Sequence, residues 1–107
     1  MPRYLWQISY TATGAKGLLS EGGTARRDAI AAMVESAGGH VEACYYAFGA
    51  TDLYVIGELP DDVAAASLSL RTAVAGGVRS QTVVLLTPEQ IDGATHREVS
   101  YRPPGEG

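Results

Sequence analysis

The chain has 107 residues, 46% of them apolar and 19% charged, which is typical of one globular domain whose thin core would benefit from self-association. Eight basic residues against twelve acidic ones give a net charge of -4, which argues against nucleic acid as a partner. A single cysteine, no apolar signal-peptide run at the N-terminus and no apolar stretch near the ~20 residues of a membrane helix lead us to expect a cytoplasmic protein with no membrane partner.

Alternation of apolar and mixed positions predicts a first strand over residues 3–10. The glycine-containing segment 11–22 has no periodicity, so we expect a loop or one short helical turn there. A helix should follow, with Thr24 as its N-cap and Gly38-Gly39 as its stop. Its apolar stripe consists of Ile30, Met33, Val34 and Ala37.

A second strand is predicted over residues 40–48 and a third over residues 53–58, and together they form a hairpin. If the second strand alternates strictly, one of its faces consists of His40, Glu42, Cys44, Tyr46 and Phe48. The next helix begins at Asp61-Asp62, whose carboxylates suit a helix N-terminus, and runs to Gly76-Gly77. We expect its inward stripe to be Val63, Ser67, Leu70 and Val74.

The last strand is predicted over residues 78–86. A short helix should begin at Thr87-Pro88-Glu89-Gln90, which combines a threonine N-cap, a proline at the first helical position and a glutamine that closes a capping box. Two prolines prevent any helix from continuing through the C-terminal segment. We therefore expect one domain over residues 1–96 and an extended arm over residues 97–107, which we hypothesise packs across a neighbouring subunit.

The predicted order is strand, helix, strand, strand, helix, strand. Right-handed crossovers turn it into a ferredoxin-like βαββαβ sandwich of the α+β class, a four-stranded antiparallel sheet with both main helices on one face. The other face would stay uncovered and would carry Tyr46 and Phe48, or their neighbours. We expect a second copy of the chain to cover it, so that the protein is a homo-oligomer, a dimer or larger.

Separated blocks along essentially the whole chain resemble the GYD domain family and match it in order. The first blocks are Tyr4-Leu5-x-Gln7-x-Ser9-Tyr10-Thr11, Lys16-Gly17-Leu18-Leu19 and Glu21-Gly22-Gly23-Thr24-x-Arg26-Arg27. The later blocks are Gly38-Gly39, Tyr45-Tyr46-x-Phe48-Gly49-x-x-Asp52, Leu59-Pro60-Asp61, Leu85-Leu86-Thr87-Pro88-Glu89 and Tyr101-Arg102-Pro103-Pro104-Gly105. One departure is Thr51, which stands where the family usually has an aromatic residue before the aspartate of its naming motif.

The resemblance implies a ferredoxin-like fold related to the dimeric α+β barrel proteins, in a family of bacteria and archaea whose role is mostly uncharacterised. Relatives by fold include small cofactor-independent monooxygenases and isomerases. One fold hosts many activities, so the resemblance names no reaction. We expect no cofactor.

Lys16, Arg26 and Arg27 form a basic cluster around the start of the first predicted helix. Arginines in a first helical turn oppose the helix dipole, whereas an anion bound there would be favoured by both the arginines and the dipole. The cluster is therefore a candidate site for a small anionic ligand. The alternative is a solvated face on which Glu21 and Asp28 neutralise the arginines.

His40 and Cys44 are residue types that bind transition metals, but four residues of strand separate them by ~13 Å. No further group of histidines and cysteines completes a set, so we expect no metal site. The same distance excludes a nucleophile paired with its base. Cys44 is interpreted as a small buried hydrophobic side chain.

Asp52 opens the third strand, where its carboxylate either caps the turn or acts as a base in a pocket. This carboxylate has several polar and aromatic residues as possible neighbours. Together they would line either a half-apolar cavity for a small aromatic or anionic ligand or, equally, the core of an interface: Asp52, Gln7, Tyr10, Tyr46, Tyr54 and Arg79.

Three functions are consistent with the sequence. The first is a homo-oligomeric domain that binds a small ligand or another partner. The second is a cofactor-independent enzyme that uses Asp52, His40 or Tyr46 as proton-transfer groups on an aromatic or dicarbonyl substrate. The third is a purely structural assembly unit.

Overall fold

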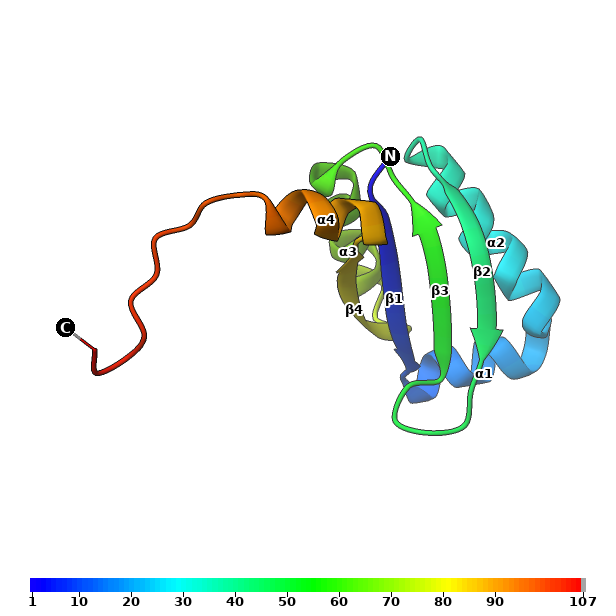
Figure 1. Ribbon diagram of the computed structural model, residues 1–107. Helices are drawn as coiled ribbons and strands as arrows, with labels where there is room; N and C mark the ends of the chain where they lie inside the picture. Colours follow the sequence, from blue (N-terminus) through cyan, green and yellow to red (C-terminus); the bar gives the residue numbers. More distant parts are fainter. Residues whose placement is uncertain (107) are drawn as a thin grey trace.

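A four-stranded sheet carries helices on one of its faces in the computed structural model, which describes residues 1–106 (Figure 1). The elements in order are β1 (Arg3–Tyr10), α1 (Ala12–Glu21), α2 (Gly23–Ser36), β2 (His40–Tyr46), β3 (Leu53–Glu58), α3 (Asp62–Ala75), β4 (Val78–Leu85) and α4 (Pro88–Thr95). The strands lie in the order β2-β3-β1-β4, and all neighbouring pairs are antiparallel. The predicted ferredoxin-like α+β fold is confirmed.

The core lies between the sheet and the helices α2 and α3. Central strand β1 turns Tyr4 and Trp6 inward, and their stacked rings have centroids 5.9 Å apart. The predicted stripe of α2 is confirmed, since Ile30 and Val34 are buried. The remaining buried hydrophobic side chains come from β3, from the chain after it and from α3: Leu53, Val55, Leu59, Ala65 and Leu68.

Helix α3 buries a different stripe from the predicted one. Val63, Leu70 and Val74 are 77%, 68% and 87% exposed, whereas Ala65 and Leu68 face the sheet. A hydrogen bond of 2.6 Å that the Tyr4 hydroxyl donates to Asp62 accompanies this rotation and brings the first residue of α3 toward β1. Residues three and six positions further along then face the sheet.

Segment 11–22 contains the ten-residue helix α1, not a loop or a single turn. The Thr11 side chain caps it by accepting a hydrogen bond from the backbone N–H of Gly14. Gly22, with a φ of 86°, ends α1 and is also the N-cap of α2. This sharp turn requires a glycine, and it places Thr24 inside α2 instead of at its N-cap.

Strand β2 ends at Tyr46, and a β-bulge shifts its pairing with β3 between Val41 and Ala43. The bulge breaks the strict alternation. Cys44 therefore packs against the core, whereas His40 pairs with Glu58 on the opposite face of the sheet. The prediction that His40 and Cys44 share a face is wrong for this reason.

The face of the sheet away from the helices is uncovered, and we call it the open face. Its apolar side chains alternate with buried positions on all four strands and include Leu5, Tyr45, Tyr54, Ile56, Val83 and Leu85. Of the two alternatives predicted for this face, the neighbours of Tyr46 and Phe48 are found there through Tyr45, whereas Tyr46 and Phe48 themselves are not. Tyr46 lies on the helix side because of the bulge, and Phe48 lies beyond the end of β2.

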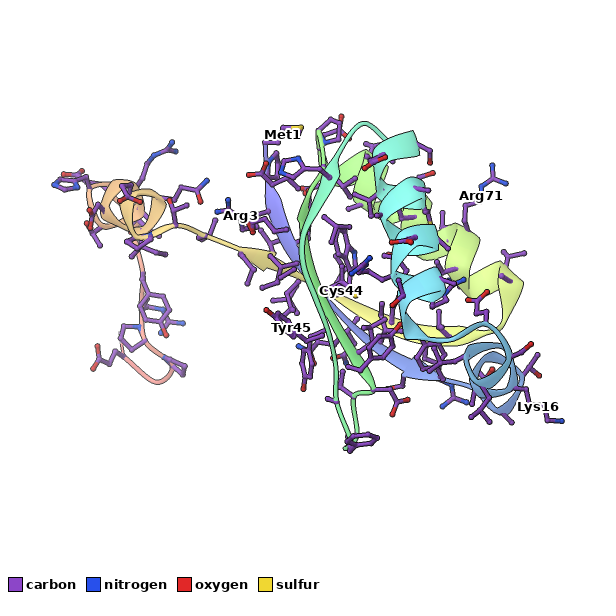
Figure 2. The ribbon with its side chains drawn as sticks, turned by 90° about the vertical axis from the view of Figure 1, so that its right-hand side faces the viewer. Met1, Arg3, Lys16, Cys44, Tyr45 and Arg71 are labelled. Carbon is purple, nitrogen blue, oxygen red and sulfur yellow. The ribbon has the colours of Figure 1, made fainter. Side chains whose placement is uncertain are left out.

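Helix α4 and the chain after it extend away from the rest of the fold. The predicted capping box is present, with Thr87 and Gln90 bonded to each other's backbone N–H groups. Figure 2 shows α4 in orange on the opposite side of the sheet from α2 and α3. The radius of gyration is 17.1 Å, whereas a compact chain of this length would have about 13 Å.

Candidate functional site

A hollow of about 400 Å³ opens where α1 meets α2, beside the loop between β2 and β3. Its volume falls in the range of roughly 300–1,000 Å³ that is usual for small-ligand pockets. Most of the wall is apolar, with two phenols and one carboxylate. The lining residues are Tyr10, Ala15, Leu18, Gly23, Tyr46, Ala47, Phe48 and Asp52.

Tyr46 forms one wall of the hollow. Its hydroxyl donates a hydrogen bond of 2.9 Å to the carbonyl oxygen of Gly23. A Cβ atom at Gly23 would lie 3.2 Å from the Tyr46 ring, so the missing side chain allows this close approach. Partial burial raises the pKa of Tyr46, and nearby Cys44 adds to the rise, while Arg26 opposes it.

Asp52 holds the ends of β1 and β2 together beside the hollow. Its Oδ2 atom accepts a hydrogen bond of 2.8 Å from the backbone N–H of Tyr10. Its own N–H donates to the carbonyl oxygen of Ile8, and its carbonyl oxygen accepts from the N–H of Ala47, both at 2.9 Å. The Asp52 carboxylate therefore bridges the β2–β3 loop to β1, 42 residues away in sequence, and the expected capping of its own turn is not among these contacts.

Tyr10 separates the hollow from a smaller cavity of about 40 Å³ between α2 and α3. Its hydroxyl oxygen is buried and has no hydrogen-bond partner within residues 1–106. Burial raises the pKa of Tyr10 to about 12, with Tyr46 adding to the rise and the guanidinium of Arg26 opposing it. The Tyr46 hydroxyl and the Arg26 guanidinium are thus the polar neighbours of this hydroxyl group, although neither forms a hydrogen bond of good geometry with it.

The proton-transfer candidates from the sequence are divided between two places. Asp52 and Tyr46 both line the hollow. His40 lies at the other end of β2, exposed on the open face, where its Nε2 atom is 3.3 Å from Glu58. His40 is therefore remote from any chemistry in the hollow.

The predicted basic cluster does not form one site. Lys16 points away from the sheet at the outer edge of α1 (Figure 2). Arg27 is exposed and pairs with Asp28 at 3.0 Å. Arg26 is half-buried, lines the cavity beside Tyr10, and has Glu21 only as a distant partner at 3.9 Å.

Three other predicted ligand-binding residues lie together elsewhere. Strand alternation places Gln7, Tyr54 and Arg79 on the open face, away from the hollow. The structure therefore separates them from Tyr10, Tyr46 and Asp52, with which the sequence grouped them.

Sequence reasoning missed the wall that α1 supplies through Ala15 and Leu18. The sequence does carry a signal for this helix. Thr11 is a residue type that caps helices, and its side chain accepts a hydrogen bond from the backbone N–H of Gly14, three residues later. Phe48, which lies beyond the end of β2, stands fully exposed at the rim of the hollow.

Within residues 1–106, no three or more histidine, cysteine, aspartate or glutamate side chains gather closely enough to hold a metal ion. In the same part of the chain, none of the helices has the length and apolar character that a membrane crossing requires.

The family model of the GYD domain matches residues 4–95, a span that runs from β1, without its first residue Arg3, to the end of α4 and contains every residue that lines the hollow. Comparison with curated proteins and with solved structures gives no match. Because the family model covers most of the chain, this protein belongs to the GYD domain family.

Proposed function

We propose that this protein is a homo-oligomeric small-ligand-binding protein whose ligand occupies the hollow between α1, α2 and the β2–β3 loop. The ligand class that fits best is a small aromatic molecule with an anionic group. We place the protein in the cytoplasm, in keeping with its single unpaired cysteine, Cys44.

The observation that carries this proposal is Tyr10, which lines the hollow and also the smaller cavity that Arg26 lines, and whose buried hydroxyl group has no hydrogen-bond partner in the described residues. Burying a hydroxyl group without a partner costs about 1–3 kcal/mol, which a fold rarely retains without a use for that group. An acceptor atom of a ligand would satisfy the hydroxyl, and an anionic acceptor would also interact favourably with the Arg26 guanidinium.

The apolar part of the ligand follows from the rest of the wall. Leu18, Phe48 and the Tyr46 ring offer flat and aliphatic surface, which favours an aromatic ring over a sugar or a small inorganic ion. Phe48 is free to close over a bound ring, because its side chain is fully exposed at the rim.

The proposed self-association rests on the open face. Tyr45 is 73% exposed and Tyr54 is 40% exposed, and they pair directly across β2 and β3. Aromatic side chains beside Leu5, Ile56, Val83 and Leu85 form an apolar surface of the kind that another subunit covers. A second copy of the chain is the partner that we propose.

A cofactor-independent enzyme is the second candidate, and it is favoured by the presence of Asp52 and Tyr46 in one hollow. Both groups already have hydrogen-bond partners, since Asp52 accepts from the Tyr10 N–H and Tyr46 donates to Gly23. Binding without turnover therefore fits this arrangement better than proton transfer does.

Ligand titration by calorimetry or by NMR tests the binding proposal. The probes are benzoate, phenylacetate and salicylate, with benzyl alcohol and acetate as compounds that lack the charge or the ring. We expect an aryl carboxylate to bind. Arg26→Gln and Tyr10→Phe should each weaken its binding about tenfold, which corresponds to a loss of about 1.4 kcal/mol in binding free energy.

The matched control is Arg27→Gln, which removes the same charge one residue away, where the arginine pairs with Asp28. It should leave binding unchanged. If all aryl carboxylates fail to bind, or if Arg27→Gln acts like Arg26→Gln, the proposal is wrong. Turnover of quinols or dicarbonyl compounds that Asp52→Asn abolishes would support the enzyme instead.

A further inference from the structure

Residues 88–106, which we call the C-terminal extension, leave the body of the fold without packing on it. Every residue of α4 is exposed, and α4 forms no extensive contact with the sheet or with another helix. The longest dimension of the molecule is 59 Å, against 32 and 24 Å in the other directions, and the C-terminal extension accounts for this elongation (Figure 1).

The C-terminal extension nevertheless has the features of a segment that binds something. An isolated helix shorter than about 12–15 residues is marginal in water, yet α4 has eight residues, a complete capping box and a proline at its start. Its exposed apolar side chains include Ile91 in α4, with Val99 and Tyr101 further along. A surface that covers these side chains would stabilise the helix.

The direction of the C-terminal extension indicates which surface this is. It departs from the end of β4 on the side of the open face, opposite to α2 and α3 (Figure 2). The outward side chains Val83 and Leu85 of β4 make the open face continuous with the start of the extension. Any molecule that packs on the open face would therefore meet α4.

The size of the open face supports a need for additional contacts. Four strands about 4.8 Å apart, each about seven residues long at about 3.3 Å per residue, present a flat area of roughly 450 Å². A standard stable interface buries about 800 Å² per partner. The flat area of the open face leaves out the relief of its side chains, but an extension that wraps around the partner would enlarge the buried surface in any case.

We propose that the C-terminal extension of each copy clasps the second copy that packs on its open face, with Ile91 and Tyr101 as its apolar contacts. This inference rests on the self-association proposed above. A two-fold pair is the arrangement that satisfies both extensions, because each copy then both donates and receives one.

Analytical ultracentrifugation of full-length variants tests the clasp. We expect the wild-type chain to be a dimer or larger, and Ile91→Asp to raise its dissociation constant at least tenfold with unchanged circular dichroism of the sheet. The matched control is Val74→Asp, which makes the same change at an exposed position on the outer side of α3 and should leave the dissociation constant unchanged.

Paramagnetic relaxation shows whether the contact is made to the other copy. One chain, without isotope label, carries Cys44→Ser and a spin label attached at Thr95→Cys. It is mixed with a second chain that is labelled with ¹⁵N. Broadening of open-face resonances in the labelled copy supports the clasp. Broadening only when label and isotope are in the same copy would show that the extension folds back, and the clasp would be wrong.

The two proposals fail in different ways. If the wild-type chain associates and Ile91→Asp associates equally well, the clasp is wrong and the self-association stands. If the wild-type chain is a monomer at 100 µM, roughly a hundredfold above a micromolar dissociation constant, both are wrong, and the ligand site is still tested separately.

Discussion

The hydroxyl group of Tyr46 lies 2.9 Å from the carbonyl oxygen of Gly23 and joins the end of β2 to the first residue of α2. This contact closes one wall of the hollow, because both residues line it. The hydrogen bond thus links the stability of the fold to the shape of the proposed ligand site.

Tyr46→Phe should lower the free energy of unfolding by about 1 kcal/mol, the net contribution of one such hydrogen bond. Urea denaturation followed by tryptophan fluorescence measures this change. The neighbouring variant Tyr45→Phe is the control, because Tyr45 is mostly exposed on the opposite face. Equal losses in the two variants would contradict the role assigned to the Tyr46–Gly23 bond.

Tyr10→Phe should have the opposite effect on stability. It removes a buried hydroxyl group that has no partner in the described residues, so the folded state no longer pays for its desolvation. We expect the free energy of unfolding to rise by about 1 kcal/mol, while ligand binding becomes weaker. A clear loss of stability in urea denaturation would show that this hydroxyl group has a structural partner.

Alkaline pH should destabilise the protein through Tyr4. Burial raises the pKa of Tyr4 to about 12, and the hydrogen bond and charge of Asp62 add to the rise. An unfolded tyrosine has a pKa of about 10. Below pH 10 both states keep the proton, so the stabilisation is complete. Between pH 10 and 12 only the folded state keeps it, and stability falls by about 1.4 kcal/mol per pH unit.

Urea denaturation at several pH values between 9 and 12 measures this slope. Tyr4→Phe is the comparison, because it keeps the ring in the core but has no proton to lose. The variant should show a shallower decline than the wild-type chain, with the decline that remains assigned to Tyr10, Tyr46 and Cys44, whose pKa values burial also raises. Identical slopes in both proteins would contradict the assignment to Tyr4.

Local signals in the sequence predicted most of the elements. The capping box at Thr87 and the carboxylate cap at Asp61 involve residues within three positions of each other, so they can be recognised without knowledge of the fold. The bounds of β3 and the stripe of α2 were likewise predicted correctly, because their periodicity is strong.

The errors concern rotation and register, which distant contacts decide. The rotation of α3 brings Asp62 within a hydrogen bond of Tyr4, a residue 58 positions away in sequence. The bulge in β2 depends on its pairing with β3, and it moves Cys44 and Tyr46 to the helix side. No local pattern carries this information.

In the candidate site, too, local sequence signals predicted which residues matter, whereas distant contacts decide where they lie. Tyr10, Tyr46 and Asp52 were recognised as a group because phenols and a carboxylate near strand ends suit a pocket. Their separation from His40, Gln7 and Arg79 follows from the sheet register, which only the structure provides. Arg26 and Arg27 are adjacent in sequence, and only their surroundings distinguish them.

Gly14 determines how closely α1 approaches the turn between α3 and β4. A Cβ atom at Gly14 would lie 1.9 Å from the carbonyl oxygen of Gly77, and this backbone is held by the N–H of Thr11, which donates to the same oxygen at 3.1 Å. Gly14→Ala should therefore push α1 away and displace the wall that Leu18 supplies to the hollow.

We expect Gly14→Ala to lower the free energy of unfolding by about 1–3 kcal/mol, although alanine is the better helix former, because the clash is with backbone atoms. Gly17→Ala is the matched control in the same helix, since a Cβ atom there has open space. It should raise stability by roughly 0.5–1 kcal/mol and leave ligand binding unchanged. Urea denaturation and ligand titration of both variants provide the measurement. If Gly14→Ala stabilises the chain as much as Gly17→Ala does, α1 does not lie against Gly77, and the hollow lacks the wall that Leu18 would supply.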